Sequence, residues 1–199
     1  MNKRNIPIVT SVLIVLNVLV FLYMEYIGFE AADSFMDQYG MYWPAVIQDG
    51  QWYRIITHMF VHSGGEHILN NMFMLGILGY QIEKEYGSVK YVISYFVCGI
   101  GGAVISAMAE MWQNQAVFSV GASGAIFGIF GIMLVMIFKN RRQMGQVSAP
   151  RLILLFILMV FGNMEEGVDW MAHFGGAIVG VVIAFICYRP KFGNNRFSI

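Results

Sequence analysis

Charged residues are scarce in this chain of 199 residues, and their scarcity excludes an ordinary water-soluble globule. Asp, Glu, Lys and Arg make up 12% of the sequence and hydrophobic residues 58%, whereas an average soluble domain has about 25% charged residues. We therefore predict a membrane protein, with one domain covering residues 1–199. The net charge at pH 7 is zero, which argues against nucleic acid as a partner.

Cysteine is just as scarce, and a disulfide framework is excluded with it. Cys98 and Cys187 both lie within apolar runs, where we expect them to be packing residues. A metal site is disfavoured too, because the chain has no HExxH pattern. His58 and His62 have the i, i+4 spacing of one helix face, but they precede the apolar run of the next helix. The sequence predicts no metal ion.

The sequence contains six apolar runs, and each predicts a membrane-spanning helix. The first follows a basic start like that of a signal peptide, but no small-residue cleavage pattern follows it, so we expect a retained helix. The fifth is short for a bilayer core of about 30 Å, so it begins before Pro150 or lies in a thinned membrane. The six runs are residues 8–27, 67–82, 89–108, 122–138, 150–162 and 169–188.

The few charges separate into two groups when six spans are assumed and the N-terminus is placed in the cytoplasm. The basic residues then lie on the inner side, as is typical of membrane proteins, and Arg54 is the exception. The outer side and outer helix ends hold every acidic residue except Glu83 and Glu85. Adding or removing one span would scramble this partition. The sequence therefore predicts an all-α, six-transmembrane-helix bundle with both termini cytoplasmic.

Polar side chains inside a bilayer are costly and tend to be functional, and four of them lie in the predicted spans. Each lies within the first two turns of a helix that runs inward. At a rise of 1.5 Å per residue, this places each on the order of 10 Å or less below the outer face. We therefore expect the four at one level: His67 and Asn71 on the second span, Ser123 on the fourth and His173 on the sixth.

The fourth and sixth spans can approach closely, because small residues repeat at four-residue spacing on both. Their contact would bring Ser123 within reach of His173, and a helix start at Ser123 would favour a developing anion there. Taken alone, Ser123 is more often a packing residue, and His173 or Asn71 more often an interhelical hydrogen-bond partner. Together with His67, these residues indicate a nucleophile, a base and oxyanion donors. The small residues are Gly124, Gly128, Ala172, Gly176 and Gly180.

At this point the sequence resembles the rhomboid intramembrane serine proteases. The matching elements are GASG around Ser123, AHFGGAIVG around His173 and HILNN from His67 to Asn71. QWYRIITHMFVH, residues 51–62, is similar to the tryptophan and arginine signature of the family's outer loop. The resemblance extends over about residues 50–185.

The resemblance implies a six-helix bundle with a water-filled site that opens outward, where a Ser and His dyad cleaves peptide bonds in or near membrane-spanning segments. Ser123 would be the nucleophile and His173 the general base. His67, Asn71 and the Ser123 backbone N–H would form the oxyanion hole. The expected partners are single-span membrane proteins and the lipid bilayer, the expected location is a bacterial plasma membrane, and no cofactor is implied.

The family resemblance also implies supporting residues. Gly121 and Gly124 would shape the turn at Ser123, and Arg54 and Glu83 would be structural. The segment FGNMEEGV, residues 161–168, is similar to the family's mobile cap over the site.

Two departures from the family pattern stand out. Tyr53 separates Trp52 from Arg54, so either aromatic residue could take the outer-loop role. Phe127 occupies the position, four residues after Ser123, where some members have a tyrosine that packs on the histidine.

Two other functions remain open alternatives. A catalytically inactive rhomboid-like protein that binds membrane clients would be expected to lack Ser123 or His173, and both are present. A small transporter would be expected to have inverted repeats or interrupted helices at the membrane centre, whereas this polar cluster lies toward the outer face. Asp169, one turn before His173, suggests a triad, but its position also suits a helix start, and the resemblance implies a dyad.

Overall fold

The computed structural model describes residues 7–139, 149–161 and 168–189. In these ranges the chain is helical and no strand is assigned, which confirms the predicted all-α class. The elements are α1 (Ile8–Ile27), α2 (Phe29–Tyr39), α3 (Trp43–Gln48), α4 (Arg54–Thr57), η1 (His58–Phe60), α5 (Gly65–Tyr86), α6 (Ser88–Gln113), α7 (Ser123–Lys139), α8 (Ala149–Phe161) and α9 (Trp170–Cys187).

Each predicted span lies on one long helix, in the order α1, α5, α6, α7, α8 and α9. The helices α5 and α6 continue beyond the apolar runs, because a helix does not end where its hydrophobic stretch ends. Among the described helices, α1, α6 and α9 are long and apolar enough to cross a membrane. The count of six spans therefore stays a prediction.

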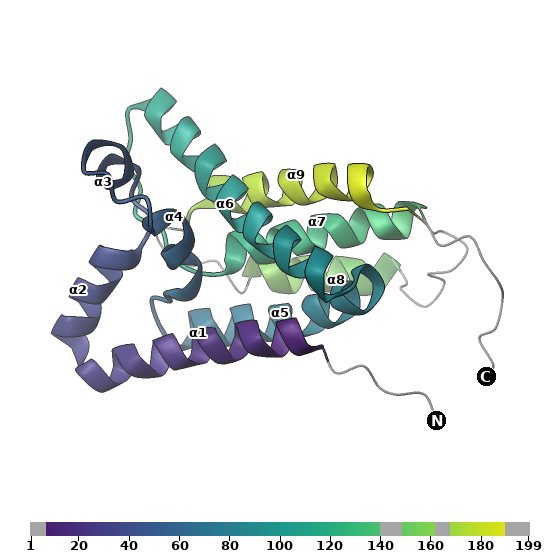
Figure 1. The fold of residues 1–199 in the computed structure, drawn as a ribbon, viewed down its shortest axis with the longest axis horizontal. Helices are drawn as coiled ribbons and strands as arrows, with labels where there is room; N and C mark the ends of the chain where they lie inside the picture. The colour runs from purple at the N-terminus through teal and green to yellow at the C-terminus, as the bar shows by residue number, and fades with distance from the viewer. Residues whose placement is uncertain (1–6, 140–148, 162–167, 190–199) are drawn as a thin grey trace.

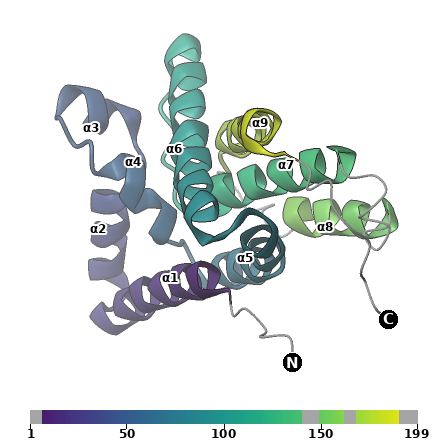
Figure 2. The same cartoon turned by 45° about the vertical axis from the view of Figure 1, so that its right-hand side comes forward.

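The helix α7 lies at the centre of the bundle, and most of its residues are buried. It packs against α5, α6 and α9, and α9 also packs along α6; Figure 2 shows these helices together. The helix α1 lies along α5, while α2, α3 and α4 gather at one end of the bundle (Figure 1). The start of α1 and the end of α9 lie at the opposite end.

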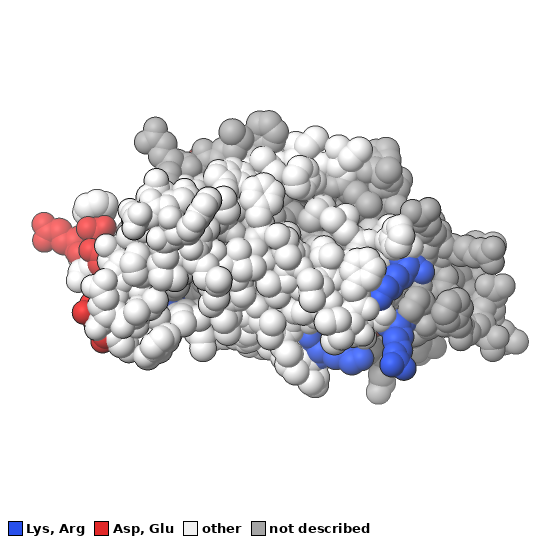
Figure 3. Space-filling view, turned by 90° about the horizontal axis from the view of Figure 1, so that it is seen from above, with Lys and Arg blue, Asp and Glu red and all other residues white. Residues whose placement is uncertain are grey.

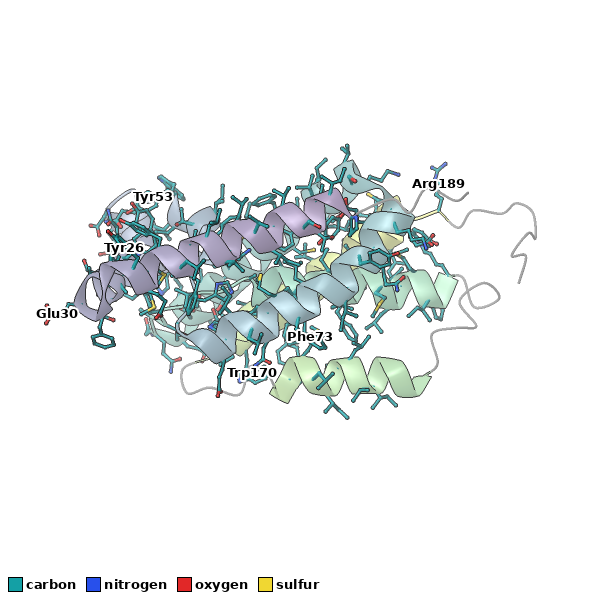
Figure 4. All side chains as sticks on the ribbon, turned by 90° about the horizontal axis from the view of Figure 1, so that it is seen from below. Tyr26, Glu30, Tyr53, Phe73, Trp170 and Arg189 are labelled. Atoms are coloured by element: carbon teal, nitrogen blue, oxygen red, sulfur yellow. The ribbon has the colours of Figure 1, made fainter. Side chains whose placement is uncertain are left out.

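Charges mark the two ends of the molecule. Figure 3 shows Asp and Glu side chains at the end where α2 lies, Lys and Arg at the other end, and a largely uncharged surface between them. Glu30 and Arg189 illustrate this separation in Figure 4. The charge separation predicted along the sequence is therefore present in space.

Glu83 joins three helices at the basic end. Its carboxylate accepts hydrogen bonds from the backbone N–H groups of Val9 (3.0 Å) and Thr10 (2.9 Å) at the start of α1. It also accepts from the hydroxyls of Thr10 (2.8 Å) and Ser88 (2.7 Å). The N–H groups at a helix start have no partner within the helix, so Glu83 fixes the start of α1 to the junction between α5 and α6.

Arg54 is buried among the short helices at the acidic end. Its Nη1 donates to the backbone oxygens of Asp37 (2.6 Å) and Gly40 (2.7 Å), and its Nε donates to Gln51 (2.6 Å). Arg54 therefore connects α2 to α4. The guanidinium carbon lies 6.0 Å from the centre of the Tyr53 ring, whereas Trp52 is 62% exposed. Of the two aromatic residues, Tyr53 is the one whose ring lies at cation–π distance from the arginine.

Candidate active site

Ser123 is the first residue of α7, reached through a tightly held turn at Gly121. Gly121 has a φ of +116°, which side-chain-bearing residues rarely adopt. Its N–H donates to the backbone oxygen of His58 at 2.8 Å. Ahead of the turn, Ser119 exchanges two backbone hydrogen bonds with Met41, of 2.8 and 3.0 Å. The backbone N–H of Ser123 is therefore among those at the start of a helix, which have no acceptor one turn earlier.

The predicted approach of α7 and α9 is confirmed, because glycines of α9 lie directly on the backbone of α7. A Cβ atom on Gly176 would collide with the carbonyl oxygen of Gly124, and one on Gly180 with that of Gly128. This close packing needs the small residues at these positions. It sets the distance between the first turns of the two helices, which carry Ser123 and His173.

Ser123 and His173 are in direct contact. The Oγ of Ser123 lies 2.7 Å from Nε2 of His173, and both residues are buried. The Phe127 ring stacks on the imidazole, with centroids 4.4 Å apart and planes 6° from parallel. Trp170 meets the same imidazole edge to face at 5.3 Å; Figure 4 labels it at the start of α9. The imidazole is thus held between two aromatic side chains with Nε2 directed at the hydroxyl.

His67 lies beside the turn that precedes Ser123. Its Nε2 is 2.7 Å from where a Cβ on Gly121 would be, so the absence of a side chain at Gly121 leaves room for the imidazole. The other ring nitrogen, Nδ1, is 2.8 Å from Oγ of Ser63. Asn71 is buried one turn further along α5, and its Nδ2 donates to the backbone oxygen of His67 at 3.0 Å. The amide has a second hydrogen to donate.

A cavity of about 260 Å³ connects these groups. Ser123, His67 and His173 contribute to its polar wall, as do His58 and Asp169, while Met36, Phe118 and Val168 are part of its apolar wall. Asn71 is not among the lining residues; it lies behind His67. The structure therefore brings three of the four predicted polar residues to one cavity and places the fourth beside it.

Two further histidines lie near this cavity but are neutral at pH 7. Burial lowers the pKa of His58 to about 4 and that of His62 to about 3. Nδ1 of His58 is 2.9 Å from the backbone oxygen of Arg54, and the His62 ring packs edge to face on His67 at 5.1 Å. Within the described ranges, no group of three His, Cys, Asp or Glu side chains is arranged to hold a metal ion.

Asp169 is the N-cap of α9. Its Oδ1 accepts from the N–H of Ala172 at 2.9 Å and from the hydroxyl of Ser106 at 2.6 Å. Nδ1 of His173, the nitrogen that a triad aspartate would contact, is buried and has no hydrogen-bond partner among the described residues. The carboxylate of Asp169 is thus directed at the helix start and at α6.

Three contacts around the site were not found from the sequence. Trp170 precedes His173 by three residues, a spacing that places both on one helix face and could have revealed the contact. Ser63 precedes His67 by four residues, but outside the helix, where that rule does not apply. Ser106 is 63 positions from Asp169 in the chain, and no spacing rule connects them. The segment likened to a cap lies outside the described residues at positions 162–167.

Comparison with known proteins gives consistent matches. A family model for the Rhomboid domain matches residues 49–190. Rhomboid protease AarA of Providencia stuartii is 30% identical over 200 residues, which cover 88% of this chain and 70% of that protein. Rhomboid protease GluP of Bacillus subtilis is 30% identical over 188 residues (94% of this chain, 36% of that protein). RHOMBOID-like protein 2 of Arabidopsis thaliana is 32% identical over 171 residues (83% and 52%). The chain thus spans about half or less of the length of these last two relatives.

Proposed function

The chain belongs to the rhomboid family, and from this premise we propose that it is an intramembrane serine protease that cleaves membrane-spanning proteins with a Ser and His dyad. Family membership and the apolar helices make it an integral membrane protein. The observation that carries the proposal is the 2.7 Å contact between Ser123 and His173 beside a cavity.

The proposed chemistry follows from which group can give or take a proton. As Oγ of Ser123 attacks the peptide carbonyl, its hydrogen passes to Nε2 of His173. The imidazolium then gives this proton to the leaving amine, and a water molecule hydrolyses the acyl ester with His173 again as base. Phe127 and Trp170 hold the ring in place, which is part of what an aspartate does in a triad.

The oxyanion that forms during attack needs hydrogen-bond donors. The backbone N–H of Ser123 is one, because the start of α7 has no acceptor for it and carries the positive end of the helix dipole. The imidazole of His67 and the second amide hydrogen of Asn71 are the other two. Their positions beside Gly121 support this role.

A cleavage assay tests the function. The purified protein is incubated in detergent with a model single-span membrane protein, and products are identified by mass spectrometry. A cut within or next to the span that is absent from a Ser123→Ala preparation is the expected result. Binding of the substrate without any cut would favour a client-binding protein instead.

The orientation in the membrane is part of the proposal. We propose six spans with both termini cytoplasmic, in a bacterial plasma membrane, and cleavage near the outer face. Alkaline phosphatase fused after Glu110 should be active, because that position would be outside, and the same reporter fused after Lys139 should be inactive. An inactive fusion at Glu110 would contradict the six-span arrangement.

Asp169 is expected to be dispensable for the chemistry. We predict that Asp169→Asn changes turnover by less than about tenfold, whereas loss of a triad aspartate costs about 10⁴. Asparagine still caps the helix and still offers an oxygen to Ser106. Turnover of the model substrate is measured for the variant, with folding checked by thermal melting; a loss near the larger figure would mean that this protein uses a triad.

A further inference from the structure

The hydroxyl of Ser106 lies between two carboxyl groups. Its Oγ is 2.6 Å from Oδ1 of Asp169 and 3.1 Å from Oε1 of Glu110. Ser106 and Glu110 are both buried. Glu110 uses its other oxygen, Oε2, to accept from the backbone N–H of Val117 at 2.9 Å. The cluster therefore connects the end of α6, the segment that leads to Ser123, and the start of α9.

If both carboxyl groups are ionised, Ser106 has too few hydrogens to make hydrogen bonds to both of them. A serine hydroxyl donates one hydrogen, and an ionised carboxylate only accepts. The shorter contact assigns that hydrogen to Asp169. The contact between Ser106 and Glu110 is then a hydrogen bond only if Glu110 carries a proton and donates it to the serine oxygen.

The two helix ends favour the same assignment. Asp169 caps the start of α9, where the helix dipole stabilises a negative charge. Glu110 lies in the last turn of α6, where the dipole disfavours one. A buried carboxylate without a cation also pays a desolvation cost that protonation removes.

No cation near the pair offsets two negative charges among the described residues. The imidazoles of His58 and His173 lie close enough to Asp169 to interact with its charge. Burial lowers the pKa of His58 to about 4. Arg54 of α4, which also packs on α6, directs its guanidinium to Gln51 and to two backbone oxygens.

The other elements packed on α6 bring no counter-charge either. The segment 114–122 and the first turns of α7 carry no charged residue. The acidic residues at the same end of α1 and α5, Glu25 and Glu66, are exposed. Glu165 and Glu166 lie outside the described residues.

We propose that Glu110 is protonated in the folded protein and is a positioning residue that, through Ser106, holds the start of α9 and with it His173. The protonated Oε1 of Glu110 donates a hydrogen bond to Oγ of Ser106, and the hydroxyl of Ser106 donates its own hydrogen to Asp169. The backbone N–H of His173 in turn lies 3.3 Å from the backbone oxygen of Asp169. Because Oε2 of Glu110 also accepts from the backbone N–H of Val117, the same side chain holds the segment that leads to Ser123.

The consequence is a stability that falls as the pH rises. Glu110 keeps its proton in the folded state at a pH where the unfolded chain has already lost it. The free energy of unfolding therefore falls with rising pH over the range in which the unfolded state binds fewer protons. Glu110→Gln removes this dependence, because the amide donates to Ser106 and accepts from Val117 without a proton to lose. The matched control is Glu85→Gln, a change at an exposed carboxylate near the other end of the bundle.

The test compares thermal unfolding midpoints from about pH 5 to pH 9, with every protein carrying Ser123→Ala so that the result does not depend on the proposed function. The parent and Glu85→Gln should lose at least about 3 °C relative to Glu110→Gln between about pH 6 and pH 9. Parallel curves for all three would overturn the proposal.

A second measurement covers the case in which Glu110→Gln does not fold. The parent protein should show the infrared carbonyl band of a protonated carboxylic acid at pH 7, and Ser106→Ala should shift the position of that band. Absence of the band from the parent at pH 7 would overturn the proposal. A third measurement, which rests on the proposed function, uses the active protein. At about pH 9, where the wild type loses turnover, Glu110→Gln should keep it.

Discussion

Ser123→Ala and His173→Ala are each expected to abolish cleavage of a model single-span substrate while leaving the protein folded and inserted. The alanine at 123 lacks the attacking oxygen, and the alanine at 173 leaves the hydroxyl without a base at 2.7 Å. Neither change opens the contact between α7 and α9, because that contact is made by glycines further along both helices. Turnover and the melting midpoint are measured on the same preparations.

The double variant tests whether the two residues act together. Groups that act as a unit give non-additive losses, so the Ser123→Ala, His173→Ala protein should be no slower than either single variant. Phe127→Leu provides the control for packing on the imidazole: it removes the stacked ring but leaves the dyad atoms, and some turnover should remain. Normal turnover of Ser123→Ala would exclude the mechanism.

Much of this site could be predicted because its residues follow helical spacing rules and because polar side chains inside a bilayer are energetically costly. Polar residues at equal depth in apolar helices pointed to Ser123 and His173, and the glycine spacing on both helices predicted their approach. The position of Ser123 at a helix start was expected on chemical grounds, and α7 does begin there. These signals are local to one helix or depend only on depth.

What could not be predicted depends on contacts between distant segments. The segment between the first two long helices folds into α2, α3, α4 and η1, of which the last three are too short to show a clear apolar period. The position of Arg54 depends on backbone oxygens of Asp37 and Gly40, which carry no side-chain signal. Likewise, the sequence placed Glu110 among outer charges, whereas the fold buries it against Ser106.

The oxyanion donors differ in how they are held, and this difference shapes the second large expected effect. His67 is fixed from both sides, since Ser63 lies at Nδ1 and the bare backbone of Gly121 at Nε2. Asn71 is tied to α5 through one amide hydrogen. The Ser123 backbone N–H is part of the helix start and is not removed by any side-chain change.

His67→Ala and Asn71→Ala are therefore each expected to lower turnover by roughly 10-fold to 1,000-fold, the range for loss of one oxyanion donor, without abolishing it. Because an oxyanion exists only in the transition state, kcat and kcat/KM should fall together and KM should change little. Gln81→Ala serves as the matched control: it removes an exposed amide further along α5, and should leave kcat within about threefold of the wild type. The measurements are steady-state cleavage rates of one model substrate at several concentrations. If neither His67→Ala nor Asn71→Ala slowed cleavage beyond the Gln81→Ala control, α5 would have no part in holding the oxyanion, and the backbone at the start of α7 would carry that role alone.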